Sequence, residues 1–218
     1  WTRISSPSGS FRYTPEGCIF ESASLCTYSD VDQDFFYALA GANSCITIPQ
    51  LDLVNPTTNL LSGYFDMIHL PDHDTAVRSI SAQNAKHLVD IAKSDWDAYE
   101  TSWDFTKLPL LQPDYRAETL EASYTALRTY WQGMTDEMRT LEEENNRIFI
   151  DAYGLQDELT PEVPLNEITL TCNPAYRYGI KKDAEANETR LRADTMAEFL
   201  SYAVACMFGR YSLDEPGL

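Results

Sequence analysis

Two of the three histidines, His69 and His73, stand four residues apart in the string HLPDHD. On one face of an α-helix, such a pair would chelate a divalent metal ion. Pro71 lies between them and breaks a helix, because proline lacks the amide hydrogen and its ring clashes with the preceding turn. We therefore expect a polar surface loop here and no metal site.

The string Asn173-Pro174-Ala175-Tyr176 resembles the Asn-Pro-Pro-Tyr loop with which amino-methyltransferases hold a flipped adenine. In that loop the asparagine and backbone carbonyls accept hydrogen bonds from the exocyclic amine, and the aromatic ring stacks on the base. Here an alanine replaces the second proline, and no glycine-rich cofactor loop precedes the string. We favour an asparagine-proline turn with buried tyrosines, and we expect no catalytic residue in the chain.

Other catalytic signatures are missing. The 9 glycines are never closer than eight residues apart, so no GxG loop is available to cradle a phosphate or a nucleoside cofactor. No lysine follows an acidic residue by two positions, which excludes nucleases of the PD-(D/E)xK kind. The 5 cysteines form no CxxC pair, which indicates neither a disulfide framework nor a zinc site.

The chain is strongly acidic, with a net charge of -18 over 218 residues. Nonspecific binding to nucleic acid depends on clustered lysines and arginines that release counterions from the phosphates, so this composition argues against it. Any contact with nucleic acid must be local, or must be shared with a basic partner.

The ends and the apolar segments set further expectations. No apolar run approaches the roughly 20 residues that span a bilayer, and no signal peptide opens the chain, so we expect no membrane partner and a cytoplasmic location.

The chain opens on Trp1 and stops abruptly after SLDEPGL. We interpret it as a piece of a longer protein.

Residues 1–76 are rich in aromatic and β-branched side chains and in turn signals. The alternation in SPSGSFRYTPEGCIF predicts two short strands joined by a turn. DQDFFYALAGANS predicts a short helix that ends near Gly41 or Asn43. CITIPQLDLV alternates again, and Pro49 makes it an edge strand or a broken strand. We expect a small mixed α/β module with long irregular loops.

Residues 77–218 follow a helical pattern. A helix over 81–105 would carry Leu88, Trp96 and Trp103 on one face. From Leu120 to Ala152 the seam residues are separated alternately by four and three positions, which predicts a long helix over about 116–153 with a coiled-coil-like seam. Asn145 lies in this seam, either to fix the register between helices or at a solvated end. The expected fold class is α+β, with the mixed module followed by a bundle of long helices.

The stretches FRYTPEGCIFE, FFYALAGANS and NPTTNLLSGYFDMIHLP resemble the target-recognition region that follows the catalytic domain in adenine-specific DNA methyltransferases and fused restriction-modification enzymes. LEEENNRIFIDAYGLQDELTPEV resembles the helical segment that comes after that region. FLSYAVACMFGRYSLDEPGL is similar to the corresponding part of the PglX family, the methyltransferases of BREX phage-defence systems. The resemblance extends over nearly the whole chain.

The resemblance implies that the parent protein methylates adenine N6 from S-adenosylmethionine, with a catalytic domain that lies outside this chain. It implies double-stranded DNA and other subunits of the defence system as partners, and no cofactor in this chain. Asparagine, serine, threonine and arginine side chains read base edges by paired hydrogen bonds. The candidates for contact with DNA are Arg3, Arg12, Asn55, Thr57, Thr58, Asn59, Arg177, Lys181 and Lys182.

Two functional hypotheses remain open. In the first, the chain is the DNA-recognition and spacer part of such a methyltransferase, and its few cations gather on one face. In the second, it is an acidic helical module that docks other subunits and touches DNA little, and it exposes an apolar patch along one helix. The charge favours the second hypothesis and the resemblance favours the first.

Overall fold

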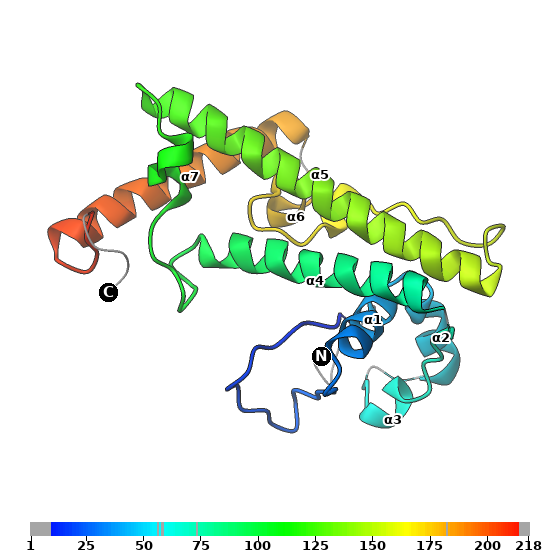
Figure 1. Cartoon of the computed structure of the whole chain (residues 1–218). Helices are drawn as coiled ribbons and strands as arrows, with labels where there is room; N and C mark the ends of the chain where they lie inside the picture. The colour runs from blue at the N-terminus through cyan, green and yellow to red at the C-terminus, as the bar shows by residue number, and fades with distance from the viewer. Residues whose placement is uncertain (1–9, 56, 58, 73, 182, 214–218) are drawn as a thin grey trace. The chain divides into compact units, whose positions relative to one another are not determined.

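The computed structural model describes residues 10–55, 57, 59–72, 74–181 and 183–213. The longest helices are α4 (Thr75–Asp97), α5 (Leu120–Tyr153) and α7 (Ala184–Met207) (Figure 1). The shorter α-helices are α1 (Asp32–Ala42), α2 (Thr47–Val54), α3 (Ser62–Phe65) and α6 (Pro174–Tyr178). Three 3-10 turns complete the set: η1 (Pro109–Leu111), η2 (Pro113–Tyr115) and η3 (Leu165–Glu167).

The expected α+β fold class is wrong, because the described residues form helices and loops without a β-sheet. The first two strands were expected within residues 6–20, of which 6–9 lie outside the described residues; residues 10–20 are irregular, and Ile19 is 97% exposed. Alternating apolar residues make a strand only where a neighbouring strand accepts their backbone hydrogen bonds and a core covers one face. In the described part of this segment no neighbouring strand is present, and of its apolar residues Phe11 alone is buried.

The second error concerns CITIPQLDLV, which forms helix α2 rather than a strand. Pro49 is the third residue of α2, where the first-turn amides have no intrahelical acceptor, so proline removes no helical hydrogen bond. Thr47 and Leu51 are the buried residues of this helix. Residues four positions apart lie on the same face of a helix, whereas we had interpreted the apolar positions as the two-residue alternation of a strand.

The chain divides into two compact units. Unit 1 comprises Trp1–Val89 and Thr140–Glu162, and unit 2 comprises Asp90–Arg139 and Val163–Leu218. Helices α4 and α5 therefore each contribute one part to each unit. The predicted boundary at residue 76, between a recognition region and a docking region, stays a prediction.

Unit 1 has two apolar clusters. One gathers Tyr37, Ile46, Ala85 and Phe149 from α1, α4, α5 and the turn before α2. Asn84 of α4 donates to Oε2 of Glu144 at 3.0 Å and lies 3.5 Å from Oδ1 of the buried Asn145. This amide contact sets the position of α4 along α5 within unit 1, which agrees with the register role considered for Asn145. The second cluster is described with the loop that it supports.

Unit 2 is built around the seam of α5. Leu127, Trp131, Met134 and Met138 are all 6% exposed or less. Helix α4 ends at Asp97, where Ser102 donates to its side chain at 2.6 Å, so the expected helix over 81–105 is shorter than predicted. The side chain of Trp103 is consequently outside any helix and fully exposed.

None of the helices in the described part of the chain is both long enough and apolar enough to cross a bilayer.

Candidate nucleic-acid interface

The candidate recognition loop of unit 1 contains Asn55, Thr57 and Asn59 and connects α2 to α3. Oδ1 of Asn55 accepts hydrogen bonds from the amide of Thr57 at 3.2 Å and from its hydroxyl at 2.9 Å. The amide of Asn59 donates to Oγ1 of Thr57 at 3.3 Å. The three predicted residues therefore form one local turn of the type that asparagine favours, and the side chains of Thr57 and Asn59 are exposed.

The second apolar cluster of unit 1 supports this loop. Phe11, Ala42, Leu51 and Leu60 are buried in it, and Leu60 follows the loop directly. The partly buried side chains packed against this cluster are Leu39, Tyr64, Phe65 and Ile68. The aromatic and aliphatic residues after the loop thus pack against α1 and α2, whereas Met67 is 59% exposed.

The predicted cations lie in different parts of the chain. Arg12 is exposed in unit 1, whereas Arg177 and Lys181 belong to unit 2. Arg3, Thr58 and Lys182 lie outside the described residues, as does His73. His69 follows α3 and precedes α4, so it is not part of a helix. Among the described residues, no group of three or more His, Cys, Asp or Glu side chains is placed to hold a metal ion.

Arg177 is engaged inside unit 2 rather than presented to solvent. Its guanidinium contacts Oε1 of Glu198 at 2.8 Å and lies over the ring of Tyr99, 5.5 Å from its centre. The side chains of Arg177 and Glu198 are only 21% and 31% exposed. An arginine held in this way joins α6 to α7 and has little freedom to approach a phosphate.

Lys181, Arg190 and Arg192 are exposed cations of the same region. Lys181 lies between α6 and α7. The guanidinium of Arg190, in the second turn of α7, lies 4.4 Å above the ring of Tyr178, and its side chain is 54% exposed. Sequence reasoning missed Arg190, since twelve residues separate it from Tyr178 and no local spacing relates the two.

The Asn-Pro-Ala-Tyr string is structural. Asn173 is 3% exposed, and its Nδ2 donates to the carbonyls of Leu165 and Ile168 at 2.7 and 2.9 Å. Its Oδ1 accepts from the amide of Ala175 at 3.1 Å and so caps α6. Every group with which this asparagine would hold an adenine is already used by the backbone. The structure thus supports the turn that we favoured, but the expected burial of the tyrosines is wrong, because Tyr176 is 45% exposed.

Asp95 holds the backbone just before that string. It is 4% exposed, and its two carboxylate oxygens accept hydrogen bonds from the amides of Thr171 and Cys172 at 2.6 and 3.0 Å. Burial, with the neighbouring Asp95 carboxylate as a further cause, raises the pKa of the Cys172 thiol, which therefore stays protonated at neutral pH. This thiol is suited to packing and not to nucleophilic attack.

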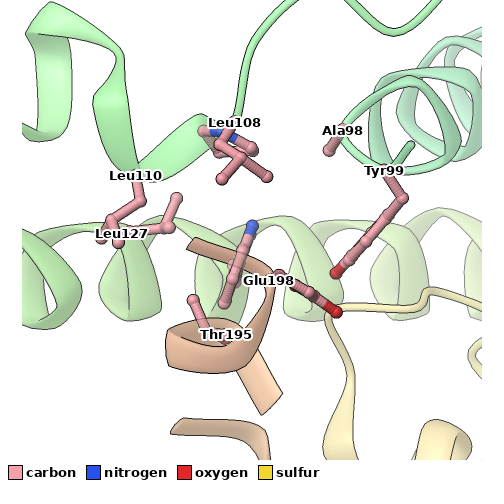
Figure 2. Close-up of a pocket in the computed structure, with 9 residues that line it drawn as sticks. Ala98, Tyr99, Leu108, Leu110, Leu127, Thr195 and Glu198 are labelled. Atoms are coloured by element: carbon pink, nitrogen blue, oxygen red, sulfur yellow. The ribbon is translucent and has the colours of Figure 1, made fainter. Parts of the chain in front are cut away.

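A small hollow in unit 2 lies beside the Arg177 contact (Figure 2). Tyr99, Leu127, Thr195 and Glu198 are among the residues that line it, and the Tyr99 hydroxyl points towards the Glu198 side of the hollow. That hydroxyl is buried and has no hydrogen-bond partner among the described residues. The free space is about 10 Å³, enough for about one water molecule. The hollow does not fit a nucleoside cofactor such as S-adenosylmethionine.

Comparison with known proteins places these features in context. No family model matches the chain. The adenine-specific methyltransferase PglX of Lacticaseibacillus casei (strain Zhang) is 33% identical over 224 residues, which cover 100% of this chain and 17% of that protein. The adenine-specific methyltransferase BrxX of Escherichia coli O9:H4 (strain HS) is 33% identical over 225 residues, with the same coverage. The predicted resemblance to PglX is confirmed, and the chain spans about a sixth of the length of these relatives.

Proposed function

We propose that this chain, which is similar over its whole length to a segment of PglX and BrxX, is the DNA-recognition and scaffolding part of an adenine-specific methyltransferase. The observation that carries the proposal is 33% identity to two adenine-specific methyltransferases without a gap in coverage. The whole protein would methylate adenine N6 in double-stranded DNA, as part of a BREX phage-defence system in the cytoplasm. S-adenosylmethionine would supply the methyl group in a catalytic domain outside residues 1–218.

The structure of unit 1 supports a recognition role. Asn59 presents an exposed side-chain amide beside Thr57, whose hydroxyl is bonded to Asn55 and to the amide of Asn59, and the cluster around Leu60 follows directly. A side-chain amide of this kind pairs with base edges. The net charge of -18 means that phosphate contacts must come from a few placed cations.

The experiment that tests this proposal is selection from a pool of random-sequence duplexes with the purified chain at about 50 mM and about 200 mM salt. We expect binding that weakens steeply with salt and enriches a short motif. Asn59→Ala should remove the enrichment and leave the salt dependence unchanged, since Asn59 would contact a base and not a phosphate. Binding without an enriched motif would contradict recognition by this loop.

A second candidate function is docking of another subunit of the defence complex, and an exposed row of apolar side chains on α7 favours it. Leu200, Val204, Met207 and Phe208 are 63%, 50%, 84% and 85% exposed. Their spacing of four, three and one places them on one face of the end of α7. Apolar side chains grouped in this way are typical of a surface that another protein covers.

Leu200→Gln combined with Met207→Gln tests this second function. In titrations against purified subunits of the defence system, we expect the double variant to bind one of them at least tenfold more weakly than the original chain. Duplex binding should not change. Equal affinity of both chains for every subunit would contradict docking through this face.

A further inference from the structure

The segment 176–192 is basic in an otherwise acidic chain. It carries five lysines and arginines against three acidic residues, while the whole chain has 16 against 34. Two charged residues of this segment form ion pairs with residues outside it. Arg177 contacts Glu198, and Glu188 accepts a hydrogen bond from Nε of Arg128 at 2.8 Å. The cations left over in the described part of the segment are Lys181, Arg190 and Arg192.

Arg190 is held in one orientation although more than half of its side chain is exposed. Tyr178 lies beneath its guanidinium, and the hydroxyl of Tyr178 donates to Oδ2 of Asp194 at 2.7 Å. Nε of Arg190 lies 3.9 Å from the same oxygen, which is too long for a direct hydrogen bond. Asp194 thus holds the ring of Tyr178 by a hydrogen bond and forms an ion pair with Arg190. A guanidinium flat on an aromatic ring keeps its outer edge available for a planar, paired contact with phosphate oxygens.

The loop that carries Lys181 is fixed at both ends. Nδ2 of Asn187 donates to the carbonyl of Gly179 at 2.8 Å, and Gly179 adopts a φ of 74°, which favours glycine. At the other end, Asp183 accepts from the amide of Ala186 at 2.7 Å and caps α7. Lys181 is therefore exposed on a short anchored connection next to the first turns of α7.

We propose that Arg190, oriented by Tyr178, and Lys181 form a phosphate contact through which this chain binds the backbone of duplex DNA. The inference rests on the proposed recognition function and adds the place where the backbone is held. Arg177, which the sequence placed among the DNA contacts, acts here as a positioning residue that joins α6 to α7. The local positive charge explains how an acidic chain can bind a polyanion at low ionic strength.

The test compares Arg190→Gln with Arg147→Gln in the intact chain. Arg147 is a matched control: it also lies on a long helix, faces an acidic residue four positions away, and is 55% exposed against 54% for Arg190. The readout is the Kd for a labelled random-sequence duplex as salt is raised from about 50 to about 200 mM. Circular dichroism of each variant establishes that the fold is kept.

We expect R190Q to raise Kd about fivefold at the lower salt and to reduce the slope of log K against log salt by about one. R147Q should stay within about twofold of the original chain. Arg190→Lys should recover part of the loss because it keeps the charge, and Lys181→Gln should weaken binding in the same direction as R190Q.

Two outcomes would overturn the inference, and they differ in what they say about recognition. If R190Q, K181Q and R147Q all bind as the original chain does, the phosphate contact lies elsewhere while the proposed function stands. If the original chain binds no duplex even at the lower salt, both the contact and the recognition function of the isolated chain are contradicted.

Discussion

The side chain of Asn43 pairs with the backbone of Phe11 as a neighbouring β-strand would. Nδ2 of Asn43 donates to the carbonyl of Phe11 at 3.0 Å, and the amide of Phe11 donates back to Oδ1 at 3.0 Å. Asn43 also caps the end of α1, and Phe11 is 5% exposed in the cluster below the candidate recognition loop. One side chain thus joins the irregular segment before α1 to the core of unit 1.

Asn43→Ala should release this segment. Three hydrogen bonds with a net worth of about 1 kcal/mol each are lost, the third from Nδ2 to the carbonyl of Leu39 at 3.2 Å, so we expect the free energy of unfolding to fall by about 2 to 3 kcal/mol. Amide hydrogen exchange at Phe11 should accelerate. Asn59→Ala is the control, because Asn59 is exposed and should leave stability unchanged. Unaltered exchange at Phe11 in N43A would show that other contacts hold the segment.

Asp95→Asn should loosen the backbone before α6. The asparagine side chain keeps one oxygen that accepts a hydrogen bond, but its NH2 group replaces the second oxygen and faces a backbone N–H. One hydrogen bond between a backbone amide and the carboxylate is therefore lost. We expect a cost of about 2 kcal/mol and faster amide exchange at Thr171 and Cys172. Asp104→Asn, whose side chain is 71% exposed, should leave both amides protected. Similar exchange in the two variants would contradict the role of Asp95.

Two helical glycines should respond in opposite ways to alanine. Nothing lies within 4 Å of a Cβ atom added at Gly133, so G133A should stabilise the chain by about 0.5 to 1 kcal/mol through its higher helix propensity. A Cβ atom at Gly41 would clash with Cδ2 of Leu70, so G41A must displace that side chain from its packed position. Urea unfolding of both variants measures the change in the free energy of unfolding. A higher free energy of unfolding for G41A than for the original chain would contradict the prediction.

Alkaline pH should weaken unit 1 through Tyr37. Burial raises the pKa of Tyr37 to about 12, against 10.0 for a free tyrosine, and its hydroxyl donates to the carbonyl of Pro71 at 2.6 Å. Because the unfolded chain loses this proton first, the stabilisation is complete below pH 10 and is lost as pH rises towards about 12. Urea unfolding at rising pH should therefore show the advantage of the original chain over Tyr37→Phe shrinking above pH 10. A constant difference would contradict this.

The sequence predicted the helices best where many residues repeat one spacing. The seam of α5 predicted a helix over about 116–153, and α5 runs over Leu120–Tyr153. The short helix α1 was expected to end near Gly41 or Asn43, and Asn43 is its C-cap. In both cases the information is local, because periodicity and capping act within a few turns.

The errors arose where partners distant in sequence decide the structure. Alternation before α1 predicted strands, but no neighbouring strand pairs with that segment in the described residues. In the candidate interface, Arg177 forms an ion pair with Glu198, and the guanidinium of Arg190 lies over the ring of Tyr178. Both contacts depend on α6 lying beside α7. Residue types indicated which side chains can contact DNA, and the fold decides which of them are available.

The central claim is that this chain supplies target recognition to an adenine-specific methyltransferase. The most direct test exchanges it for the aligned segment of the Escherichia coli BrxX relative and maps the methylated adenines in DNA exposed to the hybrid. Our account predicts that methylation continues at a changed sequence motif. Methylation at the unchanged motif would contradict it, since recognition would then belong to another part of the protein.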